Sequence, residues 1–82
     1  MIIMIVTYSR DNKNFSKLGT GFDVPSVRKL IEADVTNQKQ NINDIEYDIK
    51  SVKDKNGNKH TIDVATCGNT VYRIWHYQAR DI

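Results

Sequence analysis

The chain has 82 residues, a formal net charge of +2 and one cysteine. A chain of this length buries roughly 60 to 65% of the surface that its unfolded form exposes, which supports a single domain, residues 1–82, around one modest core. Dinucleotide-binding folds and enzyme barrels need far more chain. A charge so close to balance does not by itself indicate a nucleic-acid binder.

Targeting and redox signals favour the cytoplasm. The longest uncharged apolar run, Met1 to Val6, is far shorter than the roughly 20 residues that span a bilayer, and it lacks the features of a signal peptide. Cys67 alone cannot form an intrachain disulfide, which fits a reducing compartment. We therefore expect a cytoplasmic protein that contacts no membrane.

The chain begins with a predicted interior strand. Residues 2–8, IIMIVTY, form a continuous apolar run rich in β-branched side chains, which is typical of a strand buried on both faces. The segment 9–23 shows no sustained period and contains Gly19 and Gly21. We predict a long loop there, with a short strand around Phe15 as the alternative.

An amphipathic helix is predicted over residues 24–35, VPSVRKLIEADV. Pro25 suits the first helical position, where the missing amide hydrogen costs nothing. The apolar residues recur at the spacing that builds one helical face. These residues are Val27, Leu30, Ile31 and Val35.

The segment 42–54 fits two patterns. Its isoleucines recur at helical spacing, but within residues 45–50 apolar and charged side chains also alternate as in a half-buried strand. Asn56-Gly57 follows, and this pair favours a two-residue hairpin turn because both positions then need positive φ. The turn favours the strand, and a helix over 42–54 remains the alternative.

A second turn is predicted at Gly68-Asn69, between two further alternating runs. The resulting order is β-α-β-β-β. This is an α+β fold in which one amphipathic helix packs on one face of a mostly antiparallel sheet. The predicted elements are strands at 2–8, 45–55, 58–66 and 70–78 and a helix at 24–35.

The turns also predict which side chains share a face of the sheet. A turn at Gly68-Asn69 places Val64 opposite Arg73, and a turn at Asn56-Gly57 places Ile49 opposite Val64. The face predicted to meet the helix then carries Tyr47, Ile49, Ile62, Val64, Val71 and Trp75. Arg73 falls on this core face too, which is unusual for a charged side chain unless it lies at an edge or the register shifts.

The opposite face is predicted to be a protein-binding patch. It mixes apolar and titratable side chains, and no second helix is available to cover it. The alternative is that the loop at 9–23 folds over it. The predicted binding residues are Tyr72, Ile74, His76, Val52, Thr61, Lys50 and Asp63.

Catalytic and metal sites are not expected. Cys67 falls at a turn, whereas His60 and His76 lie near the far end of the hairpin, about 20 Å away at about 3.3 Å per residue. A cysteine nucleophile needs its histidine within about 3 Å. The ligand spacings of a zinc site are absent from the sequence. We predict a protein that is not an enzyme and needs neither metal nor cofactor.

A weaker signal favours an anion site. Gly19-Thr20-Gly21 precedes the helix, and the free amides of a helix N-terminus attract anions. The motif lacks the lysine of a P-loop and the third glycine of a dinucleotide fingerprint. As the alternative binding site, for an anion or nucleic acid, we predict Lys13, Lys17, Arg28, Lys29, Lys53, Lys55 and Lys59.

The composition, rich in Ile, Lys, Asn and Asp, is similar to that of accessory proteins from phages and mobile elements with AT-rich genomes. That resemblance covers no motif and implies only that many such proteins bind and block, or redirect, a larger host protein. We therefore predict a small non-catalytic binding module that acts by protein-protein contact, as an inhibitor or regulator, for example in anti-defence. The alternative is a nucleic-acid-binding accessory protein that uses the basic loop and hairpin.

Overall fold

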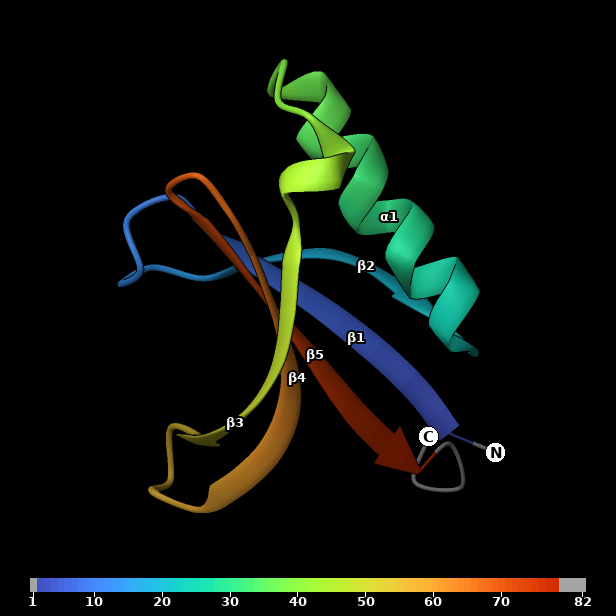
Figure 1. The fold of residues 1–82 in the computed structure, drawn as a ribbon. Coiled ribbons are helices and arrows are strands. Elements are labelled where there is room, and N and C mark those ends of the chain that lie inside the picture. The colour runs from blue at the N-terminus through green and yellow to red at the C-terminus, as the bar shows by residue number, and fades with distance from the viewer. Residues whose placement is uncertain (1, 79–82) are drawn as a thin grey trace.

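The structure is a computed structural model and describes residues 2–78. Five strands form one antiparallel sheet in the order β2-β1-β5-β4-β3, and a helix packs on one of its faces (Figure 1). The fold is α+β, as predicted. The elements are β1 (Ile2–Ser9), β2 (Ser16–Gly21), α1 (Val24–Asn37), the 3-10 turn η1 (Ile42–Asp44), β3 (Glu46–Lys53), β4 (Lys59–Cys67) and β5 (Thr70–Gln78).

The edge strand β2 takes up 6 residues of the predicted loop at 9–23 and begins directly after Phe15, near the short strand given as the alternative. Its two glycines lie against α1: a Cβ on Gly19 would lie 3.0 Å from Leu30 Cδ1, and one on Gly21 would lie 3.2 Å from Val27 Cγ2. Glycine therefore lets the helix approach this strand closely. The run Gly19 to Gly21 is strand and not a phosphate-binding turn, because these glycines make room for side chains of the helix.

The predicted helix is confirmed, and it extends two residues further. Its buried residues, Val27, Ile31 and Val35, belong to the apolar stripe expected from the sequence. The Asp23 carboxylate caps the N-terminus by accepting a 2.9 Å hydrogen bond from the Ser26 amide. At the helix N-terminus, where an anion was expected, a carboxylate of the chain itself therefore already accepts from the Ser26 amide.

The face of the sheet that meets α1 is the opposite of the one predicted. Tyr72 and Ile74 are only 1% and 5% exposed and lie in the core beneath the helix. They are not available to a partner, which corrects their assignment to a binding patch. Trp75 and Arg73 have the opposite parity on β5, so they point to the face without a helix. The buried core consists of Val6, Val27, Ile31, Val35, Ala65, Cys67, Tyr72 and Ile74.

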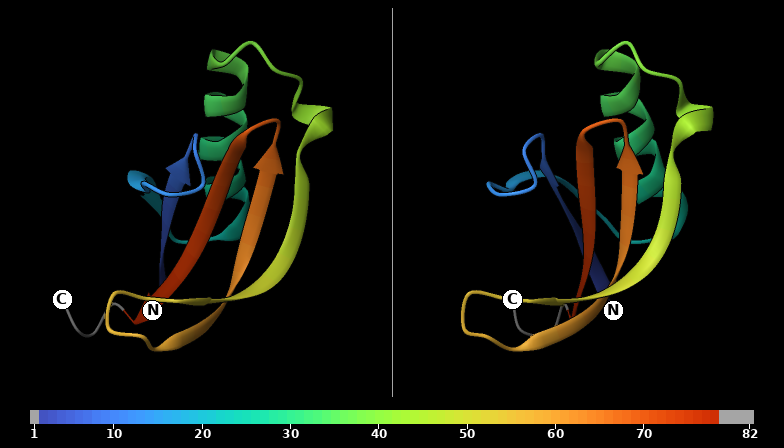
Figure 2. Two further views of the ribbon diagram at one scale, coloured as in Figure 1. Left: turned by 90° about the vertical axis from the view of Figure 1, so that its left-hand side faces the viewer. Right: turned by 60° about the vertical axis from the view of Figure 1, so that its left-hand side comes forward.

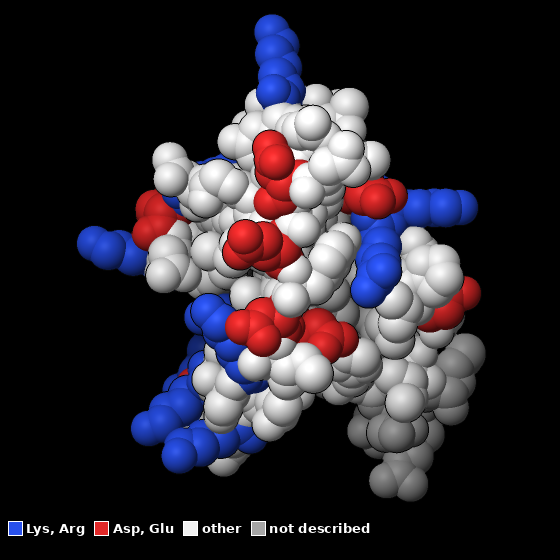
Figure 3. Space-filling view, in the orientation of Figure 1, with Lys and Arg blue, Asp and Glu red and all other residues white. Residues whose placement is uncertain are grey.

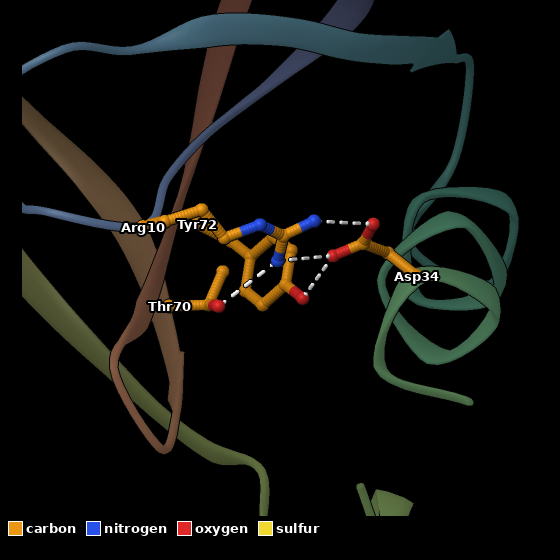
Figure 4. A network of polar contacts seen from close by, with 4 residues as sticks. All are labelled: Arg10, Asp34, Thr70 and Tyr72. Carbon is orange, nitrogen blue, oxygen red and sulfur yellow. Dashed lines mark hydrogen bonds and ion pairs between the residues drawn. The ribbon is translucent and has the colours of Figure 1, made fainter. Parts of the chain in front are cut away.

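A polar network ties α1 to this core (Figure 4). The Asp34 carboxylate accepts two hydrogen bonds of 2.9 Å from Arg10 and one of 2.5 Å from the Tyr72 hydroxyl. Arg10 also donates to Thr70 Oγ1 at 2.9 Å. Burial by itself raises the pKa of Asp34, but the hydrogen bonds from Arg10 and Tyr72 outweigh it and leave this pKa below its usual value. The network gives the buried phenol a charged acceptor.

One hairpin has the predicted register and the other does not. Thr66 pairs with Val71 across the tight turn at Gly68, as expected. In the β3-β4 hairpin Asp48, and not Ile49, lies opposite Val64. Of the two predicted turn residues only Gly57 has positive φ, +83°, so the loop takes three residues instead of two and shifts the pairing by one. Residues 46–53 form a strand, so the helical alternative over 42–54 is wrong apart from the short turn η1.

The β3-β4 hairpin bends strongly. Figure 2 shows its tip curling away from α1 and across the face of the sheet that carries no helix. Ile62 and Val64 point to that face, yet each is only 4% exposed. The bend therefore gives the helix-free face a concave, partly apolar surface.

Candidate functional site

A groove of about 600 Å³ lies on the helix-free face. Its floor comes from β1 and β5, and its walls come from the loop after β1 and from the tip of the β3-β4 hairpin. We call it the basic groove. It is lined by Ile5, Thr7, Lys13, Phe15, Lys53, Asp54, Lys55, Asn56, Arg73, Trp75 and Tyr77.

Aromatic side chains line much of the groove. The Arg73 guanidinium lies over the Phe15 ring, 4.0 Å from its centroid. The half-buried Trp75 donates its indole N–H to Thr7 Oγ1 at 3.2 Å, and the His60 ring meets its indole edge-on, with 5.5 Å between centroids. Tyr77 is 48% exposed at the end of the row. These contacts fix the rings of Phe15 and Trp75 before any ligand arrives.

The groove is positively charged. Its lining contains Lys13, Lys53, Lys55 and Arg73 against one carboxylate, Asp54. That carboxylate is committed to the hairpin turn. It bonds the His60 ring at 2.9 Å and accepts the backbone amides of residues 56 and 58. The hydrogen bond from His60, with those amides, lowers the pKa of Asp54, so the turn holds this one negative charge in its ionised form.

The loop that carries Lys13 is ordered by one aspartate. Asp11 Oδ1 accepts the backbone amides of Lys13 and Asn14 at 2.9 and 3.0 Å and the Ser9 hydroxyl at 2.8 Å. The amides of Asn14 and Lys13 hold the pKa of Asp11 well below its usual range. This Asx-type turn presents Lys13 and Phe15 to the groove from a preformed loop.

The structure divides the predicted cationic set. Lys13, Lys53 and Lys55 line the basic groove. Arg28 and Lys29 lie on α1, on the other side of the sheet, where Arg28 stacks 4.7 Å from the centroid of the Tyr47 ring. The remaining two are exposed on strands, Lys17 opposite Thr7 and Lys59 opposite Lys53.

The predicted protein-binding set is also divided between the faces. Tyr72 and Ile74 are buried under α1, and His76 on the same face lies 3.6 Å from the Asp63 carboxylate. Thr61 is exposed on the helix side. It is two residues from Asp63 on β4, and Asp63 pairs with Ile74 beneath the helix, so the two side chains share that face. Lys50 and Val52 lie on the helix-free face beside Arg73. No single surface contains all seven residues.

Sequence reasoning missed Phe15, Arg73, Trp75 and Tyr77 as groove residues. The sequence did contain one signal. Arg73 and Trp75 are two residues apart on β5, so their side chains point to the same face of the sheet. A charged side chain on the supposed core face indicates that the helix covers the other face.

The single cysteine is poorly placed to act as a nucleophile. Cys67 is buried, and its thiol donates to the carbonyl of Asn41 over 3.9 Å. Burial raises the pKa of this thiol, which opposes formation of the nucleophilic thiolate. Among residues 2–78, no three His, Cys, Asp or Glu side chains gather closely enough to hold a metal ion.

Comparisons with family models, with curated proteins and with solved structures found no match to this chain. Within residues 2–78, no helix combines the length and the apolar character needed to cross a membrane.

Proposed function

We propose that this chain is a non-catalytic binding module that holds an acidic segment of a larger protein in the basic groove. The observation that carries the proposal is the union, in one concave surface, of four cationic side chains with Phe15, Trp75 and Tyr77. By occupying that segment the module acts as an inhibitor or regulator of the protein it binds.

The residue types suit protein recognition. Trp, Tyr and Arg dominate the energetic centres of protein interfaces, where they fill desolvated pockets. Tyrosine and tryptophan bring a large apolar area at low entropic cost. In this groove Trp75 lies against Thr7 and His60, and Arg73 stacks on Phe15, so little side-chain freedom remains to be lost on binding.

The charge selects the partner. Four Lys and Arg side chains face one carboxylate that is already bonded within the hairpin turn. An acidic segment with interspersed apolar or aromatic side chains complements both features, and the positive potential steers its approach.

Single-stranded nucleic acid is the second candidate, favoured by the same excess of cations beside stacking rings. Such strands bind in positively charged grooves whose aromatic side chains stack on the bases. Salt dependence separates the two candidates. Neutralising four phosphates gives a slope of about −3 in log K against log salt, at about −0.7 for each contact on a single strand.

Tryptophan fluorescence provides the test, because Trp75 is the only tryptophan of the chain and lies in the groove. The protein is titrated with a peptide of alternating Glu and Phe, and separately with a mixed-sequence single-stranded oligonucleotide over a salt series. We expect saturable binding of the peptide and a change in the Trp75 emission. Tyr77→Ala should weaken binding by about 1 kcal/mol or more, because it removes an aromatic ring that contacts the ligand at one end of the groove.

The chain offers a matched control. Tyr47 is 40% exposed on the helix side, close to the 48% of Tyr77, so Tyr47→Ala tests loss of a tyrosine outside the groove. A partner captured from lysate by the parent and by Tyr47→Ala, but not by Tyr77→Ala, supports the proposal. Tight oligonucleotide binding with the steep salt slope and no peptide binding supports the second candidate instead. If neither probe binds and capture survives Tyr77→Ala, the groove is not the binding site.

A further inference from the structure

The strand β3 is an open edge of the sheet. It pairs with β4 on one side, and among the described residues no strand pairs with its other side. Ile49 in its middle is 66% exposed, and Tyr47 is 40% exposed. A long edge strand with exposed apolar side chains is a template for pairing with another strand.

Hydrogen bonding shows which residues of β3 face outward. At the hairpin end the Asp54 amide donates to the Asn58 carbonyl at 2.9 Å, and in an antiparallel ladder such bonded pairs recur at every second residue. The even-numbered residues of β3 therefore turn their amides toward β4, and the odd-numbered ones turn theirs outward. The Ile49 amide agrees, since it donates to the side chain of Asp48 at 2.8 Å.

Charge changes sign along the same strand. Glu46 and Asp48 precede Ile49, whereas Lys50 and Lys53 follow it. Figure 3 shows acidic side chains gathered over the upper part of the face that carries β3 and basic ones over the lower end, toward the hairpin. A second copy of β3, related to the first by a two-fold rotation, therefore places its basic residues opposite the acidic residues of the first.

We propose that β3 pairs antiparallel with β3 of a second copy of this chain, about a two-fold axis at Ile49. Ile49 of each copy then exchanges backbone hydrogen bonds with Ile49 of the other, and Tyr47 does so with Ser51. Asp48 of each copy lies directly opposite Lys50 of the second copy. To form this pair, Asp48 releases the Ile49 amide, which gains a carbonyl partner across the interface.

The outward-facing residues and the charges together select this register. Outward amides require odd-numbered residues to pair with odd-numbered ones, so the register can shift only in steps that move the axis by one residue. An axis at Asp48 places that carboxylate opposite itself, and an axis at Lys50 places two ammonium groups together. Like charges directly opposite are destabilising. An axis at Asp48 would also set Glu46 opposite Lys50, but it keeps the two carboxylates face to face at its centre. Of these three registers, only the axis at Ile49 pairs opposite charges without placing like charges opposite each other.

The apolar side chains gain cover in the same arrangement. The Ile49 side chain points to the helix side, where it lines a cavity of about 260 Å³ with Val24, Tyr47 and Ile74. Pairing sets the two Ile49 side chains against each other across the axis, beside this cavity. The inference is independent of the basic groove, because β3 presents its outer edge and not the groove to the second copy.

Charge reversal tests the register. Sedimentation equilibrium at low ionic strength, where charge pairs are screened least, is run on the parent, on Asp48→Lys, on Lys50→Asp and on the double variant. We expect a parent dimer and a roughly ten- to hundredfold weaker dimer for each single variant, because two opposite-charge pairs become two like-charge pairs. The double variant should dimerise like the parent. An equimolar mixture of the two single variants should form a heterodimer, because each then supplies the charge that the other lacks.

Lys29→Asp is the matched control, since it makes the same change of charge on the exposed face of α1. It should dimerise like the parent, and circular dichroism verifies that every variant is folded. A parent that stays monomeric up to about 1 mM, where even weak association becomes visible, overturns the proposal. So does a dimer that the single variants leave unchanged, or one that neither the double variant nor the mixture restores.

Discussion

Tyr72→Phe measures how much the link between Tyr72 and Asp34 contributes to holding the helix on the sheet. The substitution removes one hydroxyl and keeps the ring, so it leaves no large cavity beneath α1. The lost hydrogen bond runs to a charged acceptor in a place where Tyr72 is 1% exposed. A hydrogen bond to a charged group contributes about 1.5 to 3 kcal/mol. We expect the free energy of unfolding at neutral pH to fall by that amount.

Urea denaturation followed by circular dichroism provides the measurement. The expected loss lowers the midpoint by roughly 1 to 2 M, with a slope of the size usual for a small domain. In an Asp34→Asn background the same substitution should cost only about 0.5 to 1.5 kcal/mol, because the acceptor is then neutral. The difference between the two backgrounds isolates the contribution of the charge.

If Tyr72→Phe unfolds within about 0.5 kcal/mol of the parent, as surface substitutions usually do, the hydroxyl is solvated and the helix does not cover this face. Trp75→Ala would then be the more damaging change. With the helix over Tyr72, we expect Tyr72→Ala to cost about 3 to 5 kcal/mol and Trp75→Ala clearly less, because Trp75 is only half-buried.

Acid should destabilise the parent more than Asp34→Asn. The pKa of Asp34 is lowered in the folded state. Its contribution to the free energy of unfolding is therefore fully present above the unfolded pKa of about 3.9 and is lost as pH falls through the folded pKa. Unfolding curves between neutral and acid pH should show the free energies of unfolding of the parent and of Asp34→Asn converging as pH falls. Gly57→Val should cost about 1 to 2 kcal/mol, because Gly57 has φ +83°; unchanged thermal unfolding would mean that the loop tolerates the substitution. Asp23→Ala should cost about 1 kcal/mol through loss of the helix cap, whereas an unchanged urea midpoint would show the cap to be dispensable.

Local features of the chain were readable from the sequence. The helix follows from Pro25 and the spacing of its apolar residues, and the first strand follows from an uninterrupted β-branched run. The last hairpin follows from Gly68, which has the positive φ that its turn requires. In each case the pattern lies within one element or one turn, where propensity and periodicity act directly.

Features that depend on contacts between distant segments were not readable. The strand β2 carries two glycines, which weaken a strand considered alone, and their role appears only when α1 packs on them. The extra residue in the β3-β4 loop shifted that hairpin by one position, which places every side chain of β3 on the other face relative to β4.

The choice of the helix-covered face was decided by tertiary structure alone. Both faces of β5 carry large apolar side chains, so alternation shows which residues share a face but not which face the helix covers. The polar groups of those side chains decide which face the helix covers. Tyr72 can be buried because its hydroxyl donates to Asp34 on the helix, which is itself paired with Arg10. Arg73 instead points to the other face and stacks on Phe15 in the groove. Asp34 is 38 residues from Tyr72 along the chain and 24 from Arg10, and only the folded structure brings these side chains together.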